Sequence, residues 1–123
     1  MAWDLTVMLP DRPGTFADAA TALGAAGVNI EGVCGIPFQG QGVVHLLVED
    51  ASQARRALEG AGIAVTDENE VLVLECPDRP GEVAKLARAL ADAGINIKLL
   101  YLATRTRVVF GVDDVAKAAA ALS

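Results

Sequence analysis

The four residues Asp11-Arg12-Pro13-Gly14 occur again as Asp78-Arg79-Pro80-Gly81, 67 positions later (78 − 11), and the expected fold rests on this repeat. An apolar run precedes each copy (LTVML and VLVLEC), and each copy opens a helix-like stretch that closes at a glycine. A repeat that keeps Gly, Pro and Asn in register preserves the positions that determine the backbone. The sequence therefore predicts that the same turn is built twice. The same shift also carries Gly27 onto Gly94, Asn29 onto Asn96 and Ile30 onto Ile97.

The composition narrows the class of protein. A chain of 123 residues allows one ordinary domain or two very small ones. It is 53% hydrophobic but only 4% aromatic, which predicts small-residue helices packed on a sheet and apolar surface left for an interface. No apolar run approaches the roughly 20 residues of a membrane span, and the N-terminus lacks the basic start of a signal peptide, so we expect a cytoplasmic protein.

The net charge and the spacing of the metal-binding and catalytic residue types argue against further classes of protein. The net charge of −6 disfavours nucleic acid as a partner. One histidine and two isolated cysteines give no metal-ligand spacing, so neither a metal nor another cofactor is expected. No nucleophile is spaced from a base as catalysis requires, and we expect no catalytic residue.

The first copy predicts a complete ferredoxin-like unit. Residues 3–9 alternate as a half-buried strand does, and residues 16–23 carry an apolar stripe at helical spacing. Pro13 suits the first helical turn, and Gly27 suits the left-handed position that ends a helix. The order βαββαβ results. The other expected elements are strands at 28–36 and 43–49 around a loop at 37–42, a helix from 50 to about 60, and a strand at 63–66.

The second copy begins after the short linker Asp67-Glu68-Asn69, which divides the chain into predicted domains 1–67 and 68–123. We expect strands at 71–76, 95–103 and 107–112, with helices before Gly94 and over 113–122. No fourth strand follows, so this copy reads βαββα and leaves an edge that either residues 63–66 or a second chain would cover. The strand at 95–103 is apolar on both faces in its later half, which predicts packing against another copy.

The turns have a possible chemical use. Free N–H groups at a helix start, with the positive end of the helix dipole, attract a carboxylate or phosphate. The glycine of each turn allows a ligand near the backbone, the aspartate would cap the helix or bind an ammonium, and the asparagine after each helix offers a donor and an acceptor. The alternative is purely structural: the aspartate caps, Pro and Gly shape the turn, and the asparagine bonds locally.

This pattern, a strand, Asp-Arg-Pro-Gly, a helix and Ala-Gly-Val/Ile-Asn-Ile in tandem, resembles the ACT domain, a ferredoxin-like regulatory module of amino-acid metabolism. The resemblance implies an α+β fold of two ferredoxin-like βαββαβ repeats, the second lacking its last strand. It implies helices on one face of antiparallel sheets that join edge to edge into an eight-stranded sheet. It also implies a homodimer, a client enzyme and a small ligand, commonly an amino acid, at ACT–ACT interfaces. The implied ligand-binding residues are Asp11, Arg12, Gly14, Thr15, Phe16, Asn29, Ile30, Asp78, Gly81, Glu82, Val83, Asn96 and Ile97.

Two residues predict unequal copies. Thr15 would add a hydroxyl to an anion site, whereas Glu82 at the same place would repel a carboxylate, so the first turn is the expected acid site. His45 should lie on the face of its strand away from the helices, either lining a sheet interface or as an ordinary surface histidine. The competing functions are an enzyme, which no motif supports, and a ligand-free dimerisation or adaptor module.

Overall fold

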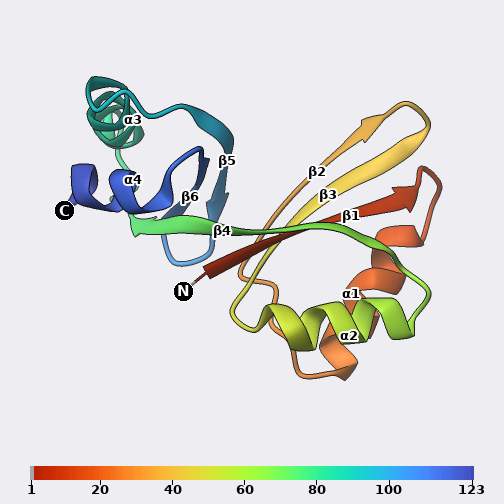
Figure 1. Ribbon diagram of the computed structural model, residues 1–123. Helices are drawn as coiled ribbons and strands as arrows, with labels where there is room; N and C mark the ends of the chain where they lie inside the picture. The colour runs from red at the N-terminus through yellow and green to blue at the C-terminus, as the bar shows by residue number, and fades with distance from the viewer. Residues whose placement is uncertain (1) are drawn as a thin grey trace. The chain divides into compact units, whose positions relative to one another are not determined.

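The computed structural model describes residues 2–123, which form two compact units. Unit 1 ends at Asn69 and unit 2 begins at Glu70, and each has its own hydrophobic core. Figure 1 labels the helices and strands. Their bounds are β1 (Ala2–Pro10), α1 (Thr15–Ala25), β2 (Gly32–Phe38), β3 (Gln41–Val48), α2 (Ala51–Gly60), β4 (Val65–Glu75), α3 (Glu82–Asp92), β5 (Ile97–Ala103), β6 (Arg107–Val112) and α4 (Val115–Leu122).

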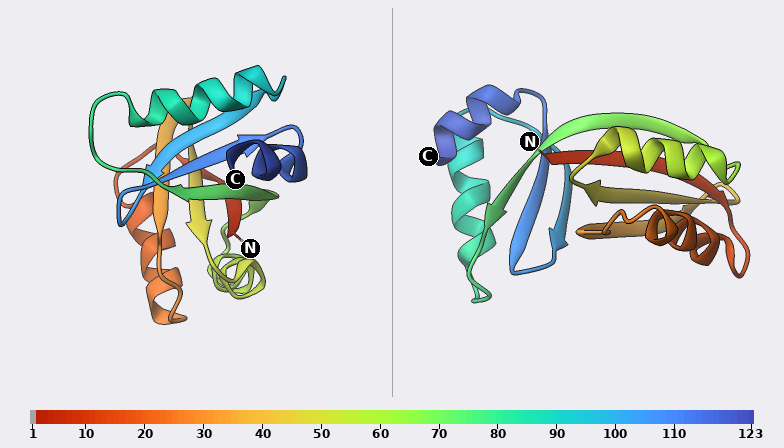
Figure 2. Two further views of the ribbon diagram at one scale, coloured as in Figure 1. Left: turned by 90° about the vertical axis from the view of Figure 1, so that its left-hand side faces the viewer. Right: turned by 90° about the horizontal axis from the view of Figure 1, so that it is seen from below.

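In unit 1, β3 lies between β1 and β2 and pairs antiparallel with both. The first part of β4 continues the sheet beside β1, where the Thr66 hydroxyl donates to the Thr6 carbonyl at 3.2 Å. Helices α1 and α2 cover one face of this sheet (Figures 1 and 2). The core lies between them because every second residue of β1 and β3 points to that face. Its fully buried members are Leu5, Val7, Ala19, Leu23, Leu46, Ala54 and Leu58.

In unit 2, β6 lies between β4 and β5 and pairs antiparallel with both. Helices α3 and α4 pack on one face, and Leu90 of α3 meets Val108 and Phe110 of β6 in the core. Leu90 is the repeat partner of Leu23 at the shift of 67 (90 − 23), so both copies place a buried leucine at the same point of their first helix. The α+β class, the antiparallel pairing and the helices on one face of each sheet are confirmed.

The segment Asp67-Glu68-Asn69 is not a linker. These residues lie inside the 11-residue strand β4, which joins the last strand of the first copy to the first strand of the second. The segment contains neither Gly nor Pro, so no residue interrupts the extended backbone. Residues 2–123 therefore form six strands rather than the seven expected, and they do not make the predicted eight-stranded sheet.

The first helix begins later than predicted. Gly14 takes the N-cap position, and α1 starts at Thr15, so Pro13 belongs to the turn and not to the first helical turn. The β2–β3 loop is shorter than expected and consists of Gln39 and Gly40, with φ of 51° and 79°. Two consecutive positive φ values are typical of the tight turn that suits the twist of a hairpin.

The second strand of each copy also begins later than predicted, at Gly32 in β2 and at Ile97 in β5. The residues after the helix-ending glycines therefore form connections rather than strand, and Asn29 and Asn96 lie in them. Among residues 2–123, no helix combines the length and apolar character needed to cross a bilayer.

Candidate functional site

The turn Asp11–Gly14 is held by its backbone. Gly14 has φ of 92°, a left-handed conformation that costs a residue with a Cβ about 1–2 kcal/mol, which explains the glycine. The Arg12 N–H donates to the Pro10 carbonyl at 2.9 Å, and the Asp18 N–H donates to the Gly14 carbonyl at 3.0 Å. No side chain caps α1, so the predicted capping role of Asp11 is wrong.

The second turn has the same geometry. Gly81 has φ of 88°, the Arg79 N–H donates to the Pro77 carbonyl at 2.9 Å, and the Lys85 N–H donates to the Gly81 carbonyl at 3.2 Å. Helix α3 likewise has no side-chain cap, so Asp78 does not cap it either. The prediction that one turn is built twice is therefore confirmed.

The residue after the glycine closes each turn differently. Thr15 Oγ1 donates to the Pro10 carbonyl at 2.8 Å and lies 3.3 Å from the Arg12 carbonyl. A hydroxyl has one proton, and the turn uses it, so Thr15 does not offer the anion-binding hydroxyl that the sequence predicted. Glu82 Oε1 accepts from Arg79 Nη2 at 2.9 Å and from Lys85 Nζ at 3.2 Å. Its negative charge is thus compensated within unit 2, and the expected repulsion of a carboxylate is weakened.

Each turn borders a small groove. In unit 1 a groove of about 220 Å³, here called groove 1, runs between the turn and the far ends of β2 and β3. Asp11 and Arg12 line it on one side, and Phe16, which is 41% exposed, stands at its wall. The strand side is lined by Gly35, Ile36, Pro37, Gly42 and Val44.

Groove 2 is the corresponding groove of unit 2, with a volume of about 270 Å³. Asp78 and Arg79 line it as Asp11 and Arg12 line groove 1, but Arg107 adds a second guanidinium. Arg107 is held in place, because its Nε donates to the Thr104 carbonyl at 2.9 Å and its Nη2 donates to Thr104 Oγ1 at 3.0 Å. The apolar part of the wall comes from Val83, Leu102 and Ala103.

Sequence reasoning missed Arg107. The shift between the copies falls from 67 to 64 across the β5–β6 hairpin, so Arg107 aligns with Val43 of unit 1 (107 − 43). The turn at 104–106 is no shorter than the Gln39-Gly40 turn, so the difference lies in the strands. Arg107 belongs to neither repeated motif, and only the folding of the hairpin brings it to the turn. In the sequence, the one indication of a positively charged site here is that Arg105 and Arg107 alternate at the connection between two predicted strands.

The asparagines do not lie at the turns of their own units. Asn29 lies beyond the C-terminal end of α1, and a helix of 11 residues separates it from Gly14 by about 16 Å at the usual 1.5 Å rise per residue. In unit 2 the Asn96 backbone N–H donates to Asp113 Oδ1 at 3.3 Å. Ile30 and Ile97, two further predicted site residues, pack against the cores of their units.

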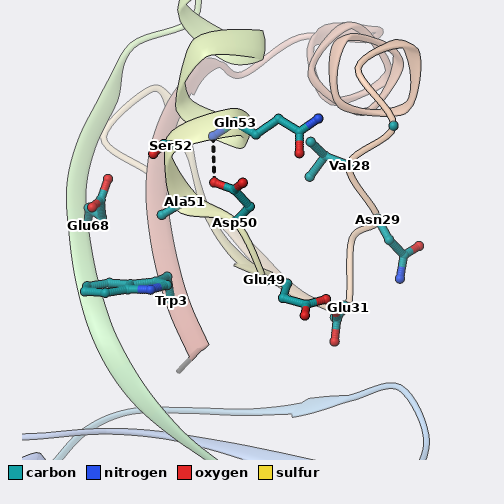
Figure 3. A pocket seen from close by; sticks show the side chains of 11 residues that line it. Trp3, Val28, Asn29, Glu31, Glu49, Asp50, Ala51, Ser52, Gln53 and Glu68 are labelled. Atoms are coloured by element: carbon teal, nitrogen blue, oxygen red, sulfur yellow. Dashed lines mark hydrogen bonds between the residues drawn. The ribbon is translucent and has the colours of Figure 1, made fainter.

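Asn29 instead borders a third cavity of about 690 Å³ in unit 1, which shares no lining residue with groove 1. Figure 3 shows the Trp3 indole and the carboxylates of Glu31, Glu49 and Glu68 around it. Two acidic side chains of this wall have structural partners. Asp50 Oδ1 caps α2 by accepting from the Gln53 N–H at 3.0 Å, and Glu68 pairs with Arg55 at 3.2 Å. Within residues 2–123, no set of three His, Cys, Asp or Glu side chains is arranged to hold a metal ion.

Known proteins similar to this chain share its architecture. Two solved structures each align with 98% of the chain. Protein BT0572 from Bacteroides thetaiotaomicron is 24% identical, with a TM-score of 0.86, and 85% of that chain is covered. The ligand-free regulatory subunit of aspartate kinase from Thermus thermophilus is 22% identical, with a TM-score of 0.75, and 87% of that chain is covered. At these identities the likeness shows the fold.

The chain is also similar in sequence to a curated relative. An aspartokinase from Corynebacterium efficiens is 43% identical over 70 residues, which make up 55% of this chain and 16% of the relative. The chain therefore spans about a sixth of the length of that relative. The family model of the ACT domain matches residues 71–122, which hold the second turn, groove 2 and the core of unit 2. Residues 71–122 therefore match the ACT domain family by sequence, and the rest of the chain shares the fold of the similar structures.

Proposed function

We propose that this chain is a non-catalytic regulatory protein that binds an amino acid beside its Asp-Arg-Pro-Gly turns, with each unit acting as one ACT domain. The observation that carries the proposal is the charge arrangement of groove 2. A carboxylate from Asp78 and guanidinium groups from Arg79 and Arg107 stand around an apolar wall. An α-amino acid presents the complementary set, an ammonium, a carboxylate and a side chain.

Groove 2 offers partners for both charges of an amino acid. Arg107 is oriented by Thr104 before any ligand arrives, so little side-chain freedom is lost when it binds a carboxylate. Arg79 also lines the groove, and its guanidinium has further donors besides the Nη2 group that holds Glu82. Asp78 is the acceptor for the ammonium group. The apolar side chains of Val83 and Leu102 favour a ligand with an aliphatic or small side chain.

Groove 1 offers less to the same ligand. It has one guanidinium, that of Arg12, and the Thr15 hydroxyl donates within the turn. We therefore propose unequal sites, and we favour the second turn over the first, which reverses the expectation based on Thr15 and Glu82 alone. We also propose that ligand binding involves further residues of both turns, namely Asp11, Gly14 and Phe16 at the first turn and Gly81 at the second.

The relatives indicate the context. An aspartokinase and an aspartate kinase regulatory subunit are among the similar proteins, so we propose that the client is an enzyme of that kind and that the protein acts in the cytoplasm. Regulation would follow from differential affinity, because a ligand that binds one arrangement of the domains more tightly shifts the population toward it.

A second candidate function is a ligand-free dimerisation or adaptor module. Leu100 and Leu102 of β5 are 46% and 68% exposed, although their neighbours across the ladder, Phe110 and Val108, are fully buried. Val33 of β2 is exposed in the same way. Apolar residues exposed along second strands favour a homodimer formed through these strands. Leu102 also lines groove 2, so association and ligand binding would share this surface.

Thermal denaturation against each of the twenty amino acids tests the first function. A binding ligand at about 100 times its Kd stabilises the folded state by about 2.7 kcal/mol, which raises the midpoint measurably. We expect Arg107→Gln to abolish the shift and Arg88→Gln, an exposed change on α3 outside the groove, to preserve it. No shift with any amino acid up to millimolar concentration would contradict the proposed ligand class.

Light scattering with Leu102→Asp tests the second function. We expect the wild type to be dimeric and the variant to be monomeric, because a charge would have to be buried in the contact. Leu102→Met is the matched control and should remain dimeric. A monomeric wild type that nevertheless responds to an amino acid would remove the dimerisation proposal and leave the ligand proposal intact.

A further inference from the structure

Three polar residues lie together on the helix-free face of the unit 1 sheet. His45 Nδ1 lies 2.8 Å from Asp4 Oδ2 and 3.4 Å from Thr6 Oγ1. Asp4 and Thr6 belong to β1 and His45 to β3, and Thr6 stands directly opposite His45 in the antiparallel register. The prediction that His45 faces away from the helices is confirmed, because its neighbours Val44 and Leu46 point into the core. It is not an ordinary surface histidine.

Asp4 is only 1% exposed, whereas a quarter of the His45 side chain remains accessible. A buried carboxylate is costly unless a cation or hydrogen-bond donors compensate it. The hydrogen bond with Asp4 raises the pKa of His45 above its ordinary value of 6.5, burial opposes this, and the charges of Asp4 and Asp67 raise the pKa further. The net effect of these contributions is a raised pKa of His45.

We propose that Asp4, Thr6 and His45 form a pH-sensitive latch between β1 and β3, in which protonated His45 holds the buried Asp4 carboxylate and deprotonation weakens the hold as the pH rises. The neutral ring can still donate through Nδ1, so the hydrogen bond persists while the charge attraction is lost. The latch therefore loosens rather than opens.

The charged groups on the strands beside His45 all raise its pKa. β1 contributes the Asp4 carboxylate, and β4 contributes the charge of Asp67. On β2, Cys34 is the Cα partner of His45. Both carboxylates favour the protonated ring. Because the pKa is raised in the folded state, the stabilisation is complete below the unfolded-state value of about 6.5 and is lost as the pH rises through the folded-state pKa.

NMR titration tests the latch directly, since His45 is the single histidine of the chain and gives a resolved imidazole signal. We expect its midpoint to lie above 6.5 in the wild type and to fall in Asp4→Asn. Asp67→Asn is a milder change and should lower the midpoint less. A wild-type midpoint at or below 6.5, or one that neither variant moves, would overturn the proposal.

A second measurement keeps the proposal testable if Asp4→Asn fails to fold. The thermal midpoint of the wild type should fall between pH 6 and about pH 8 by more than that of His45→Gln, which keeps a polar side chain but cannot be charged. Thr6→Val should retain most of the pH dependence, since it removes a long contact and no charge. Equal pH dependence in the wild type and in His45→Gln would contradict the latch.

Discussion

Unit 1 places Thr15 after the left-handed glycine of its turn, and unit 2 places Glu82 there. Thr15 closes its turn with a hydrogen bond to the Pro10 carbonyl, while Glu82 gathers Arg79 and Lys85 around one carboxylate oxygen. The backbones of the two turns are nearly the same, with glycine φ values of 92° and 88°. The repeat therefore keeps one backbone conformation and leaves the side-chain chemistry, and hence the ligand, free to differ between copies.

The largest effect should come from the equivalent core leucines and should be the same in both units. Leu23→Ala and Leu90→Ala each remove a fully buried side chain, so we expect a loss of about 2–5 kcal/mol in the free energy of unfolding. Urea denaturation followed by circular dichroism measures it. Leu102→Ala, at an exposed site, is the control and should cost far less in a monomer. A large difference between the two core variants would show that the units are not packed alike.

A smaller and again equal effect is expected at the two glycines. Gly14→Ala and Gly81→Ala force a Cβ into the left-handed region, at a cost of about 1–2 kcal/mol each. A Cβ at either position meets no atom within 4 Å, so conformational strain alone determines the loss. Gly24→Ala in α1 is the matched control and should stabilise, since its φ is not positive and its site is also open. Unequal losses at the two turns would break the structural equivalence.

The next effect, a loss of stability specific to the first turn, is expected on changing Thr15. Thr15→Val removes the hydroxyl but keeps the shape, leaving the Pro10 carbonyl without this donor, and we expect a loss of about 1 kcal/mol. Thr15→Ser retains the hydroxyl and serves as the control. Denaturation at two salt concentrations should give the same loss, because no charge is involved.

The smallest effect is expected at Glu82. Glu82 is 14% exposed but its partners Arg79 and Lys85 are mostly exposed, so Glu82→Gln should cost less than about 1 kcal/mol, and high salt should reduce the difference. The same change frees Arg79, so we expect a carboxylate ligand to bind groove 2 more tightly. Calorimetric titration measures this, and weaker binding would mean that Glu82 orients Arg79 for the ligand.

The sequence alone was sufficient to predict the features that depend on residues close together in the chain. The turn glycines, the helix stripes around Leu23 and Leu90 and the antiparallel hairpins all follow from spacing within a few residues. The strand β4 did not follow, because a short polar segment without Gly or Pro reads equally well as a linker or as an exposed strand. Strand β2 began late because its apolar residues Val28 and Ile30 serve the core from a connection.

The candidate site was only partly predictable. Its turns were, since they repeat, but Arg107 reaches groove 2 through the β5–β6 hairpin, and no motif marks it. The pair of Asp4 and His45 joins residues 41 positions apart, and only the register of β1 on β3 brings them together. Side chains that meet through sheet register depend on the pairing of whole strands, which a single sequence specifies weakly.

The uninterrupted strand β4 limits how the spacing between the two repeats can change. Successive side chains of a strand alternate between faces, so inserting one residue at 67–69 would exchange the faces of all the side chains that follow relative to those that precede. Leu72 and Leu74 pack against the core of unit 2, whereas Thr66 bonds to β1 of unit 1, so the two ends of one strand serve two cores. An odd change in the distance of 67 between the copies therefore reverses the faces of one end of β4 relative to the other, and an even change preserves them, unless a bulge absorbs the extra residue.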